Sequence, residues 1–299
     1  MSELRHLLDM DDLTSQELAT VLDLSERREV PAALASQGVG LLFEKPSART
    51  RNSMEVAVVQ LGGHPVSIRG EEVGLGTRES VEDLTKTMAC YHRILGARVF
   101  DHGTVERMAA VDEIPIVNLL SDRAHPLQTL ADLLTMRQRF KQLAGLTVAW
   151  VGDGNNVCNS LIIGAALARM HVRVATPPGF EPSSLAIEKA RDAGGRVLLT
   201  NDPAEATGVA DAVCTDVWAS MGQEGEADAR RQAFNGYTVT SELMDKANPG
   251  AIFLHCLPAH RGEEVAAEVM DGPSSLVWQQ AANRLHVARG LLLFLLGAH

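Results

Sequence analysis

Short apolar runs alternate along the whole chain with longer segments of helical spacing, and this alternation limits the fold more than any other feature of the sequence. The runs typical of buried strands are residues 39–45, 64–68, 94–100, 114–120, 146–153, 171–177, 196–202, 211–218 and 251–258. Strands separated by helices are joined as βαβ units, and such units form parallel sheets. The sequence therefore predicts an α/β fold.

The alternation occurs in two series, and the break between them lies near Gly145. A chain of 299 residues has the length of two domains of roughly 150 residues each. We therefore predict two similar domains, each a parallel sheet flanked by helices, at residues 1–136 and 137–279. Residues 276–296 have the pattern of one long C-terminal helix.

Two helix ends carry local signals. Thr14 and Glu17 fit a capping box, which predicts an N-terminal helix that begins after Thr14. Gly62 and Gly63 follow the helical segment 51–61 and predict its end, because glycine adopts the left-handed backbone of a helix C-terminus without steric cost.

Composition and charge narrow the class of protein. Hydrophobic residues make up 45% and charged residues 22% of the chain, which is typical of globular proteins and unlike disordered ones. The net charge of −11 disfavours general affinity for nucleic acid or anionic lipid, because both require a positive face. We expect no nucleic-acid or membrane partner, and any anion site must be local.

The cysteines and the N-terminal segment indicate the cellular compartment. The four cysteines are far apart and show no CxxC spacing, as in reduced cytosolic proteins. The N-terminus lacks the basic segment and apolar segment of a signal peptide, and the apolar run 291–296 is too short to span a bilayer. We expect a cytoplasmic protein, and the absence of CxxC and HExxH spacings gives no support for a metal site.

A basic motif rich in hydroxyl groups follows the first predicted strand, where a helix begins. It contains Ser47, Arg49, Thr50 and Arg51. Backbone N–H groups at a helix N-terminus attract anions, and hydroxyls and guanidinium groups add donors suited to phosphate oxygens. The motif predicts a phosphate site, and a solvated basic turn is the alternative.

A histidine and a glutamine follow the fourth predicted strand. His125 and Gln128 lie three residues apart on one helical face, and Pro126 suits the first helical position. An imidazole beside an amide can donate to a carbonyl oxygen and accept from an amino group, which suits an amide-like electrophile. A capping histidine beside a surface glutamine is the alternative.

Arg98 lies within the apolar strand 94–100, where an unbalanced guanidinium charge is costly to bury. A ligand anion would balance this charge. An internal carboxylate such as Asp83 is the structural alternative.

A glycine motif after the fifth predicted strand resembles part of a dinucleotide-binding fingerprint. It contains Gly152 and Gly154, but Val157 occupies the third glycine position and no acidic residue clearly ends the next strand. An NAD site is therefore disfavoured. Asn155 and Asn156 instead offer side-chain amides to a small polar ligand, or they simply cap the helix.

Two later strands also lead into residues that can carry chemistry. Asp216, Ser220 and Met221 follow one apolar run, and Cys256 and Pro258 lie at the end of the last one. Parallel sheets place ligands at the carboxyl ends of their strands, which makes these positions candidates. A buried cysteine is more often inert packing, so Cys256 alone proves nothing.

Taken together, the motifs are those of a known family. The chain contains "FEKPSARTR", "LGGHP", "ARVF", "HPLQ", "GDGNN", "DVWASMGQE", "HCLP" and "ANRLH", in this order. In order and spacing it resembles the ornithine carbamoyltransferases of the aspartate/ornithine transcarbamoylase family, essentially from end to end. The first and fourth motifs are shared by the wider group, whereas "DVWASMGQE" and "HCLP" resemble the ornithine branch.

The resemblance implies transfer of a carbamoyl group from carbamoyl phosphate to the side-chain amine of L-ornithine. The products would be L-citrulline and phosphate, formed in arginine biosynthesis without a cofactor or a metal. The first domain would bind carbamoyl phosphate and the second would bind ornithine. The resemblance also implies a homotrimer with sites at subunit interfaces, and a C-terminal helix, about residues 280–299, that packs back on the first domain.

The resemblance assigns a role to each matching position. The phosphate would be held by Ser47, Ala48, Arg49, Thr50 and Arg284, and Arg98 would bridge the phosphate and the carbonyl oxygen. His125 would donate to that oxygen, while Gln128 and the Leu257 backbone carbonyl would accept from the carbamoyl amide. Ornithine would be held by Asn156, Asp216, Ser220 and Met221. Cys256 would line the site near the reacting amine, so that Arg98, His125, Asp216 and Cys256 form the catalytic set.

One position departs from the family pattern. The family usually has threonine where this chain has Ala48, so one hydroxyl of the phosphate loop is missing. A backbone N–H can still donate there, and we expect weaker carbamoyl phosphate binding at most. Two alternatives remain: a transcarbamoylase that uses aspartate, putrescine or an acylated ornithine, and a catalytically silent binding or assembly subunit.

Overall fold

The computed structural model describes residues 4–219, 225 and 227–298. The chain forms two compact units: unit 1 contains Met1–Ala131 and Ala282–His299, and unit 2 contains Asp132–Ala281. No helix among the described residues is long and apolar enough to cross a membrane.

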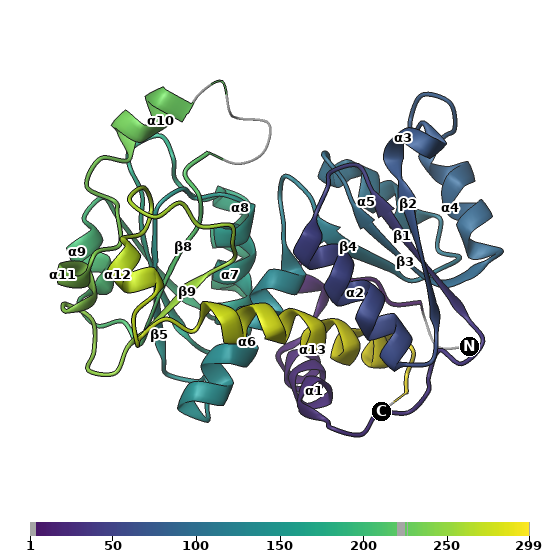
Figure 1. Ribbon diagram of the computed structural model, residues 1–299, viewed down its shortest axis with the longest axis horizontal. Helices are drawn as coiled ribbons and strands as arrows, with labels where there is room; N and C mark the ends of the chain where they lie inside the picture. The colour runs from purple at the N-terminus through teal and green to yellow at the C-terminus, as the bar shows by residue number, and fades with distance from the viewer. Residues whose placement is uncertain (1–3, 220–224, 226, 299) are drawn as a thin grey trace. The chain divides into compact units, whose positions relative to one another are not determined.

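Unit 1 is built around a four-stranded parallel sheet with the strand order β2-β1-β3-β4 (Figure 1). Its strands are β1 (Gly38–Phe43), β2 (His64–Arg69), β3 (His92–Arg98) and β4 (Ile116–Leu120). Its helices are η1 (Met10–Asp12), α1 (Ser15–Glu26), α2 (Ala48–Gln60), α3 (Gly70–Val73), α4 (Val81–Ala89) and α5 (His102–Ala110), with the start of α6 (Pro126–Phe140) and the end of α13 (Val277–Leu295). The first four strands expected from the sequence are confirmed.

Local sequence explains where the helices of unit 1 begin and end. The Thr14 hydroxyl accepts from the Glu17 N–H, and the Glu17 carboxylate accepts from the Thr14 N–H, so the predicted capping box is confirmed at the start of α1. Helix α2 ends at Gln60, and Gly62 takes a φ of +81° two residues later. Pro126 is the first residue of α6, as predicted.

The C-terminal helix α13 packs against α1 within unit 1. At Gly290 an added Cβ would lie 2.2 Å from the Ser25 hydroxyl oxygen, so only glycine permits this close approach. The Arg289 guanidinium donates to the backbone carbonyls of Ser25 (3.3 Å) and Arg27 (2.6 Å) and so satisfies the end of α1. The predicted packing of the C-terminal helix on the first domain is confirmed.

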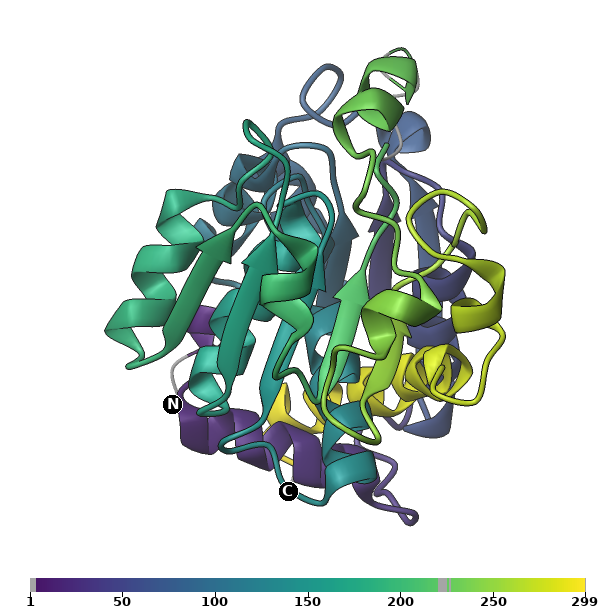
Figure 2. The ribbon, with the colours of Figure 1, turned by 90° about the vertical axis from the view of Figure 1, so that its left-hand side faces the viewer.

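Unit 2 contains a five-stranded parallel sheet with the strand order β7-β6-β5-β8-β9, whose strands run in one direction in Figure 2. Its strands are β5 (Thr147–Val151), β6 (His171–Ala175), β7 (Arg196–Thr200), β8 (Ala212–Thr215) and β9 (Ile252–His255). The remaining helices are α7 (Asn156–Leu167), α8 (Ser184–Asp192), α9 (Pro203–Thr207), α10 (Ala227–Ala233), α11 (Ser241–Met244) and α12 (Ala267–Met270). The predicted α/β class, with two parallel sheets flanked by helices, is confirmed.

Each sheet has one point where the direction of strand addition reverses. In unit 1 this point lies between β1 and β3, and in unit 2 it lies between β5 and β8. The loops that leave the carboxyl ends of two such strands run to opposite faces of the sheet, which leaves a crevice where ligands bind. The strand orders therefore define one candidate ligand position in each unit.

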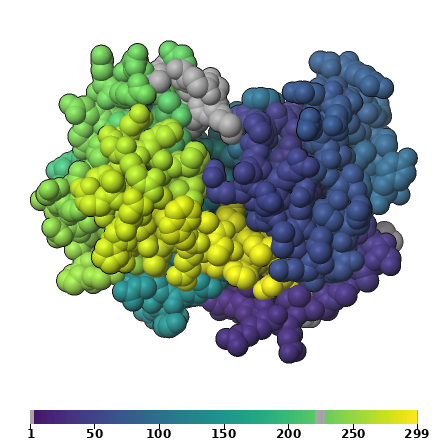
Figure 3. All heavy atoms as spheres, in the orientation of Figure 1, coloured from purple at the N-terminus to yellow at the C-terminus, as the bar shows by residue number. Residues whose placement is uncertain are grey.

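Both units have apolar cores, and each also exposes a few large apolar side chains. In unit 1 Leu95, Val105 and Met108 are fully buried between the sheet and its helices. Helix α2 lies on the face of unit 1 that is drawn in Figure 3. Its outer side carries Val56 and Val59, which are 43% and 59% exposed.

Candidate active site

The phosphate motif lies at the start of α2, directly after β1. Ser47 is the N-cap, and its hydroxyl oxygen accepts from the Thr50 N–H at 3.1 Å. Ala48 is the first helical residue and is exposed, whereas Thr50 is buried. The Ser47 hydroxyl hydrogen is still available to an anion, as is the positive end of a helix of 13 residues.

Arg284 connects three of the predicted site residues within unit 1. Its guanidinium donates to the Gln128 side-chain oxygen at 2.6 Å and to the Thr50 hydroxyl at 3.1 Å. The same guanidinium lies 3.5 Å from Nε2 of His125. All four side chains are at most 5% exposed, so α2, α6 and α13 bring together residues that are far apart in the sequence.

Two further arginines act on the same histidine. Burial lowers the pKa of His125 well below its usual value, and the charges of Arg284, Arg98 and Arg49 lower it further, in that order. His125 is therefore a neutral imidazole near pH 7. Because Nε2 faces the donor-only guanidinium of Arg284, the favoured tautomer carries its proton on Nδ1.

Arg98 ends strand β3 and is 6% exposed. Asp83, the carboxylate that could have balanced its charge, is exposed on α4 and is therefore not an internal partner. Strand β3 lies beside β1 at the point where the strand order reverses in unit 1, so Arg98 and the start of α2 lie at the same candidate position. Three buried or half-buried arginines, Arg49, Arg98 and Arg284, make this position suitable for an anion.

The second set of candidates lies at the corresponding position of unit 2. Asp216 directly follows β8 and is 6% exposed. Its carboxylate accepts from the Cys256 thiol at 2.9 Å, from the Asn155 side-chain amide at 2.8 Å and from the Val217 N–H at 2.8 Å. Residues from the ends of β5, β8 and β9 thus converge on one carboxylate.

The two asparagines after β5 have different placements. Asn155 is the N-cap of α7, and its side-chain oxygen accepts from Val157 and Cys158 while its amide donates to Asp216. Asn156, the residue matched to the family motif, is the first residue of α7 and is half-buried. The sequence pattern did not separate these two roles, because both asparagines fit a helix start.

A buried hydrogen-bonded pair holds the turn after β9. Glu264 and His255 are fully buried, and the Glu264 carboxylate lies 3.0 Å from Nε2 of His255. Nδ1 of His255 accepts from the Leu257 N–H at 2.8 Å, which fixes the imidazole proton on Nε2. Leu257 has a φ of +62°, an uncommon conformation for leucine, and this bond helps to hold its carbonyl in place.

A second buried pair lies beside the segment after β8. The Arg230 guanidinium bonds Asp153 at 2.8 Å and the Trp218 backbone carbonyl at 2.7 Å. Burial raises the pKa of Asp153, and the Arg230 charge partly offsets this effect. Sequence reasoning missed this pair and the His255–Glu264 pair, since neither has a local signature. Ser220 and Met221, which the resemblance assigns to ornithine, lie outside the described residues.

Two groups of described side chains have the composition of a metal site. Asp216, His255 and Cys256 form one group, and His260, Glu263 and Glu264 form the other. In the first group both ring nitrogens of His255 are already engaged, so this histidine has no lone pair for a metal. In the second, Glu264 already accepts from His255 and from the His260 N–H, and Arg231 contacts Glu263. We read both groups as hydrogen-bonded clusters.

The fold and these clusters define a two-domain α/β protein with a cluster of cationic side chains in one unit and a cluster centred on a carboxylate in the other. Residues 5–138 match the family model for the carbamoyl-P binding domain of aspartate/ornithine carbamoyltransferases, and residues 144–295 match the model for their Asp/Orn binding domain. The chain therefore belongs to the aspartate/ornithine carbamoyltransferase family.

Individual relatives agree with this assignment. An ornithine carbamoyltransferase of Thermus thermophilus is 50% identical over 296 residues, which cover 98% of this chain and 97% of the relative. The structure of ornithine carbamoyltransferase from Pyrococcus furiosus matches with a TM-score of 0.94 at 40% identity, covering 99% of this chain and 98% of that one. The Thermus thermophilus structure matches with a TM-score of 0.90 at 48% identity, covering 98% and 99%.

Proposed function

We propose that this protein transfers the carbamoyl group of carbamoyl phosphate to the side-chain amine of L-ornithine, giving L-citrulline and phosphate. The amine nitrogen attacks the carbonyl carbon, the bond from that carbon to the phosphate oxygen breaks, and the amine loses one proton. The observation that carries the proposal is the cluster of Thr50, His125, Gln128 and Arg284, on which Arg49 and Arg98 also act.

In this proposal the donor is held by unit 1. Ser47, Arg49, Thr50 and Arg284, with the α2 N-terminus and the Ala48 N–H, would bind the phosphate. Each hydrogen bond to a charged group contributes about 1.5–3 kcal/mol, so several together suffice for a small phosphorylated metabolite. Gln128 and the Leu257 carbonyl would accept from the carbamoyl amide and fix its orientation.

Arg98, Thr50 and His125 would stabilise the charge that develops on the carbonyl oxygen. Donors fixed before the reaction are effective in a site from which water is excluded. Neutral His125 can serve as a donor through its ring N–H, and its lowered pKa keeps it neutral among the arginines. Correct juxtaposition of the two reactants can lower the barrier by roughly 7–11 kcal/mol. Because phosphate is a good leaving group, the reaction needs little additional catalysis.

The acceptor is held by unit 2 in this proposal, and it must lose its charge before attack. An alkyl amine with a pKa of about 10.4 is unprotonated in only about 1 in 2,500 molecules at pH 7, a handicap of roughly 4.6 kcal/mol. We place the amine beside Asp216 and Cys256, with Asn156, Ser220 and Met221 around the rest of ornithine. On desolvation, before attack, the ammonium would lose one proton to solvent. The attacking nitrogen would then lose its second proton to the departing phosphate or to solvent.

One assay tests the acceptor. Purified protein with carbamoyl phosphate would receive ornithine, aspartate, putrescine or N-acetylornithine, and the ureido product would be measured colorimetrically. We expect ornithine to be preferred by at least 100-fold. Preference for any other amine would overturn the proposal for ornithine while leaving carbamoyl transfer intact.

Because Ala48 lacks one hydroxyl of the expected phosphate loop, the alternative that the protein is a catalytically silent binding or assembly subunit should be tested as well. Calorimetry with carbamoyl phosphate reports donor binding, and the citrulline assay reports turnover. Binding without turnover would identify a silent subunit. We expect both signals, because the other phosphate contacts do not require the missing hydroxyl.

We also propose that the protein is a cytoplasmic homotrimer. Val56 and Val59 on the outer side of α2 are large apolar side chains that a second copy of the chain would remove from water. Light scattering coupled to size-exclusion chromatography measures the assembly mass. A mass of 32.2 kDa at assay concentration, that of one chain, would contradict the trimer.

A further inference from the structure

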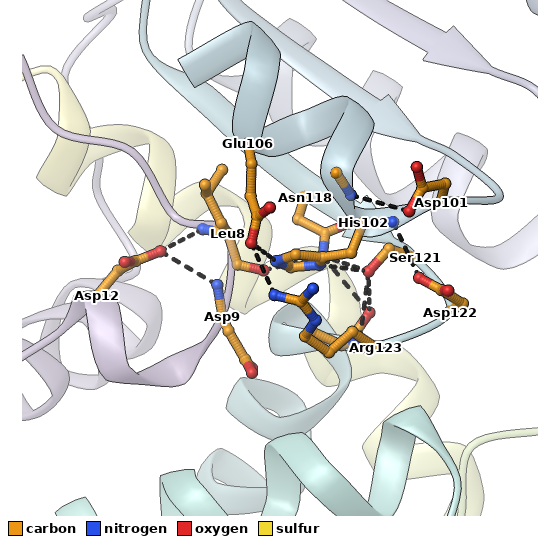
Figure 4. A network of polar contacts seen from close by, with 12 residues as sticks. Leu8, Asp9, Asp12, Asp101, His102, Glu106, Asn118, Ser121, Asp122 and Arg123 are labelled. Carbon is orange, nitrogen blue, oxygen red and sulfur yellow. Dashed lines mark hydrogen bonds and ion pairs between the residues drawn. The ribbon is translucent and has the colours of Figure 1, made fainter. Parts of the chain in front are cut away.

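A buried histidine that the proposed reaction does not use lies close to the segment that presents His125. His102 is the first residue of α5 and is 4% exposed. Its Nδ1 lies 2.7 Å from the hydroxyl oxygen of Ser121, and its Nε2 lies 3.7 Å from the carboxylate of Glu106 (Figure 4). Buried histidines of this kind need a structural or a functional reason.

Ser121 is the centre of the turn that leads to His125. Its hydroxyl oxygen accepts from the Asn118 amide at 3.1 Å and from the Ala124 N–H at 3.2 Å, and its backbone N–H donates to the Ala124 carbonyl at 3.0 Å. The turn from Ser121 to Ala124 is therefore closed by both the backbone and the side chain of one serine. His125 is the next residue, and α6 begins one residue later.

The hydrogen-bond directions around Ser121 follow from its donors. Two N–H groups donate to the hydroxyl oxygen, so its own hydrogen must point to an acceptor. Nδ1 of His102 suits this role, because it lies 2.7 Å from the hydroxyl oxygen whereas the Ala124 carbonyl lies 3.5 Å away. Nδ1 thus acts as an acceptor, and the His102 proton lies on Nε2, towards Glu106.

The next two residues of the turn, Asp122 and Arg123, also contact helix α5. The Asp122 carboxylate accepts from the His102 N–H at 2.9 Å, and the Arg123 guanidinium bonds Glu106 at 2.7 Å. Ser121, Asp122 and Arg123 are therefore each bonded to helix α5, the first two at His102 and the third at Glu106, as Figure 4 shows. Only the Ser121 contact is buried at both ends, so water cannot replace it.

We propose that His102 is a positioning residue for His125: its Nδ1 orients the Ser121 hydroxyl, which fixes the turn that presents the His125 ring. This rests on the proposed function, in which His125 contacts the carbonyl oxygen of the donor. A misplacement of about 1 Å at such a donor can reduce the rate by roughly 100-fold. His102 itself touches neither substrate.

Three substitutions at one position separate orientation of the turn from general stability. In His102→Asn the amide oxygen can occupy the place of Nδ1 and accept from Ser121. In His102→Gln the longer amide reaches towards Glu106, the place of Nε2, and His102→Leu offers no polar atom at all. Arg107→Gln is the matched control, because Arg107 lies on the same helix in an exposed ion pair with Glu82.

The experiment measures kcat and both KM values for citrulline formation, with a thermal melt of each variant. We expect His102→Leu and His102→Gln to lower kcat by about 10- to 100-fold, with the KM for ornithine changed less than about two-fold, because the predicted ornithine residues belong to unit 2. His102→Asn should recover kcat to within about three-fold of the parent, and Arg107→Gln should match the parent.

Two outcomes would overturn the positioning role. One is a parental kcat in His102→Leu, and the other is a kcat in His102→Asn no higher than that in His102→Gln. If His102→Leu does not fold, the comparison of the asparagine and glutamine variants still decides. An inactive parent protein would instead contradict the proposed function, so the two failures are distinguishable.

Discussion

The guanidinium of Arg284 donates to the side-chain oxygen of Gln128 at 2.6 Å, and this bond joins the C-terminal helix to the helix that begins at Pro126. The same guanidinium reaches Thr50 and lies beside His125. Arg284 therefore organises the proposed donor site before any ligand binds. Its charge is also one of the causes that keep His125 neutral.

Replacing Arg284 with methionine should weaken carbamoyl phosphate binding more than ornithine binding. The variant loses a charge and two hydrogen bonds at the phosphate end, and each such bond contributes about 1.5–3 kcal/mol. We expect the KM for carbamoyl phosphate to rise by about 100-fold in steady-state kinetics. The pKa of His125, followed by NMR of the ring nitrogens, should rise because a positive neighbour is gone. An unchanged KM would remove Arg284 from the donor site.

His125 should make the stability of the protein depend on pH in a defined window. In the folded protein the pKa of His125 lies well below the usual 6.5. Just below pH 6.5 the imidazole is therefore protonated in the unfolded chain but neutral in the folded chain. Stability should therefore fall as the pH drops below about 6.5, with a slope of up to about 1.4 kcal/mol per pH unit from this group. Urea unfolding of the parent and of His125→Gln between pH 6.5 and 5 would measure the slope. Equal slopes in the two proteins would contradict this assignment.

The sequence predicted the nine strands found among the described residues, and their parallel arrangement, because each apolar run is bounded by helical spacing and turn residues. It also placed the candidates at strand ends. It could not predict the strand orders, because βαβ connections permit several orders at similar cost. The reversals between β1 and β3 and between β5 and β8, which bring Arg98 to the α2 start and Asp216 to Asn155, came only from the structure.

Side-chain pairs that form through tertiary packing could not be predicted from the sequence either. Arg284 and Thr50 are separated by 234 residues, and His255 and Glu264 by nine residues of irregular chain. Neither pair has the i, i+3 or i, i+4 spacing that places two side chains side by side on one helix. The resemblance to a family named Arg284 as a phosphate ligand, but only the structure shows that it also bonds Gln128.

Asp216→Asn should impair the use of ornithine without weakening the binding of carbamoyl phosphate. The amide keeps the size of the carboxylate but removes the charge next to the proposed amine position, and it accepts less strongly from Cys256 and Asn155. We expect kcat to fall by at least about 100-fold and the KM for ornithine to rise. Carbamoyl phosphate binding, measured by calorimetry, should stay within about two-fold, because its predicted ligands lie mostly in unit 1. Equal losses for both substrates would argue against this division.

His255→Leu should destabilise unit 2. The substitution removes the His255 N–H that donates to the fully buried Glu264 carboxylate and leaves that charge incompletely bonded, which typically costs about 3–5 kcal/mol. For a unit of this size the melting temperature should fall by about 10 °C in a thermal scan. His171→Leu is the control, because His171 is exposed on β6 and should leave the melting temperature within about 2 °C of the parent. Similar melting temperatures for both variants would contradict a stabilising role for the pair.

Ala48→Thr should improve the proposed donor site, because it adds the hydroxyl that the resemblance to the family leads us to expect at this position. Ala48 is exposed at the first position of α2, so the larger side chain meets no packed neighbour there. One additional hydrogen bond to a charged oxygen contributes at most about 1.5–3 kcal/mol. The net gain is smaller, because threonine has a lower helix propensity than alanine and loses rotamer freedom when it binds. We expect the KM for carbamoyl phosphate to fall by about three- to ten-fold, with kcat changed less than two-fold. Ala48→Val, which has the same shape without the hydroxyl, is the matched control, and an equal fall in KM for both variants would show that the hydroxyl is not the cause.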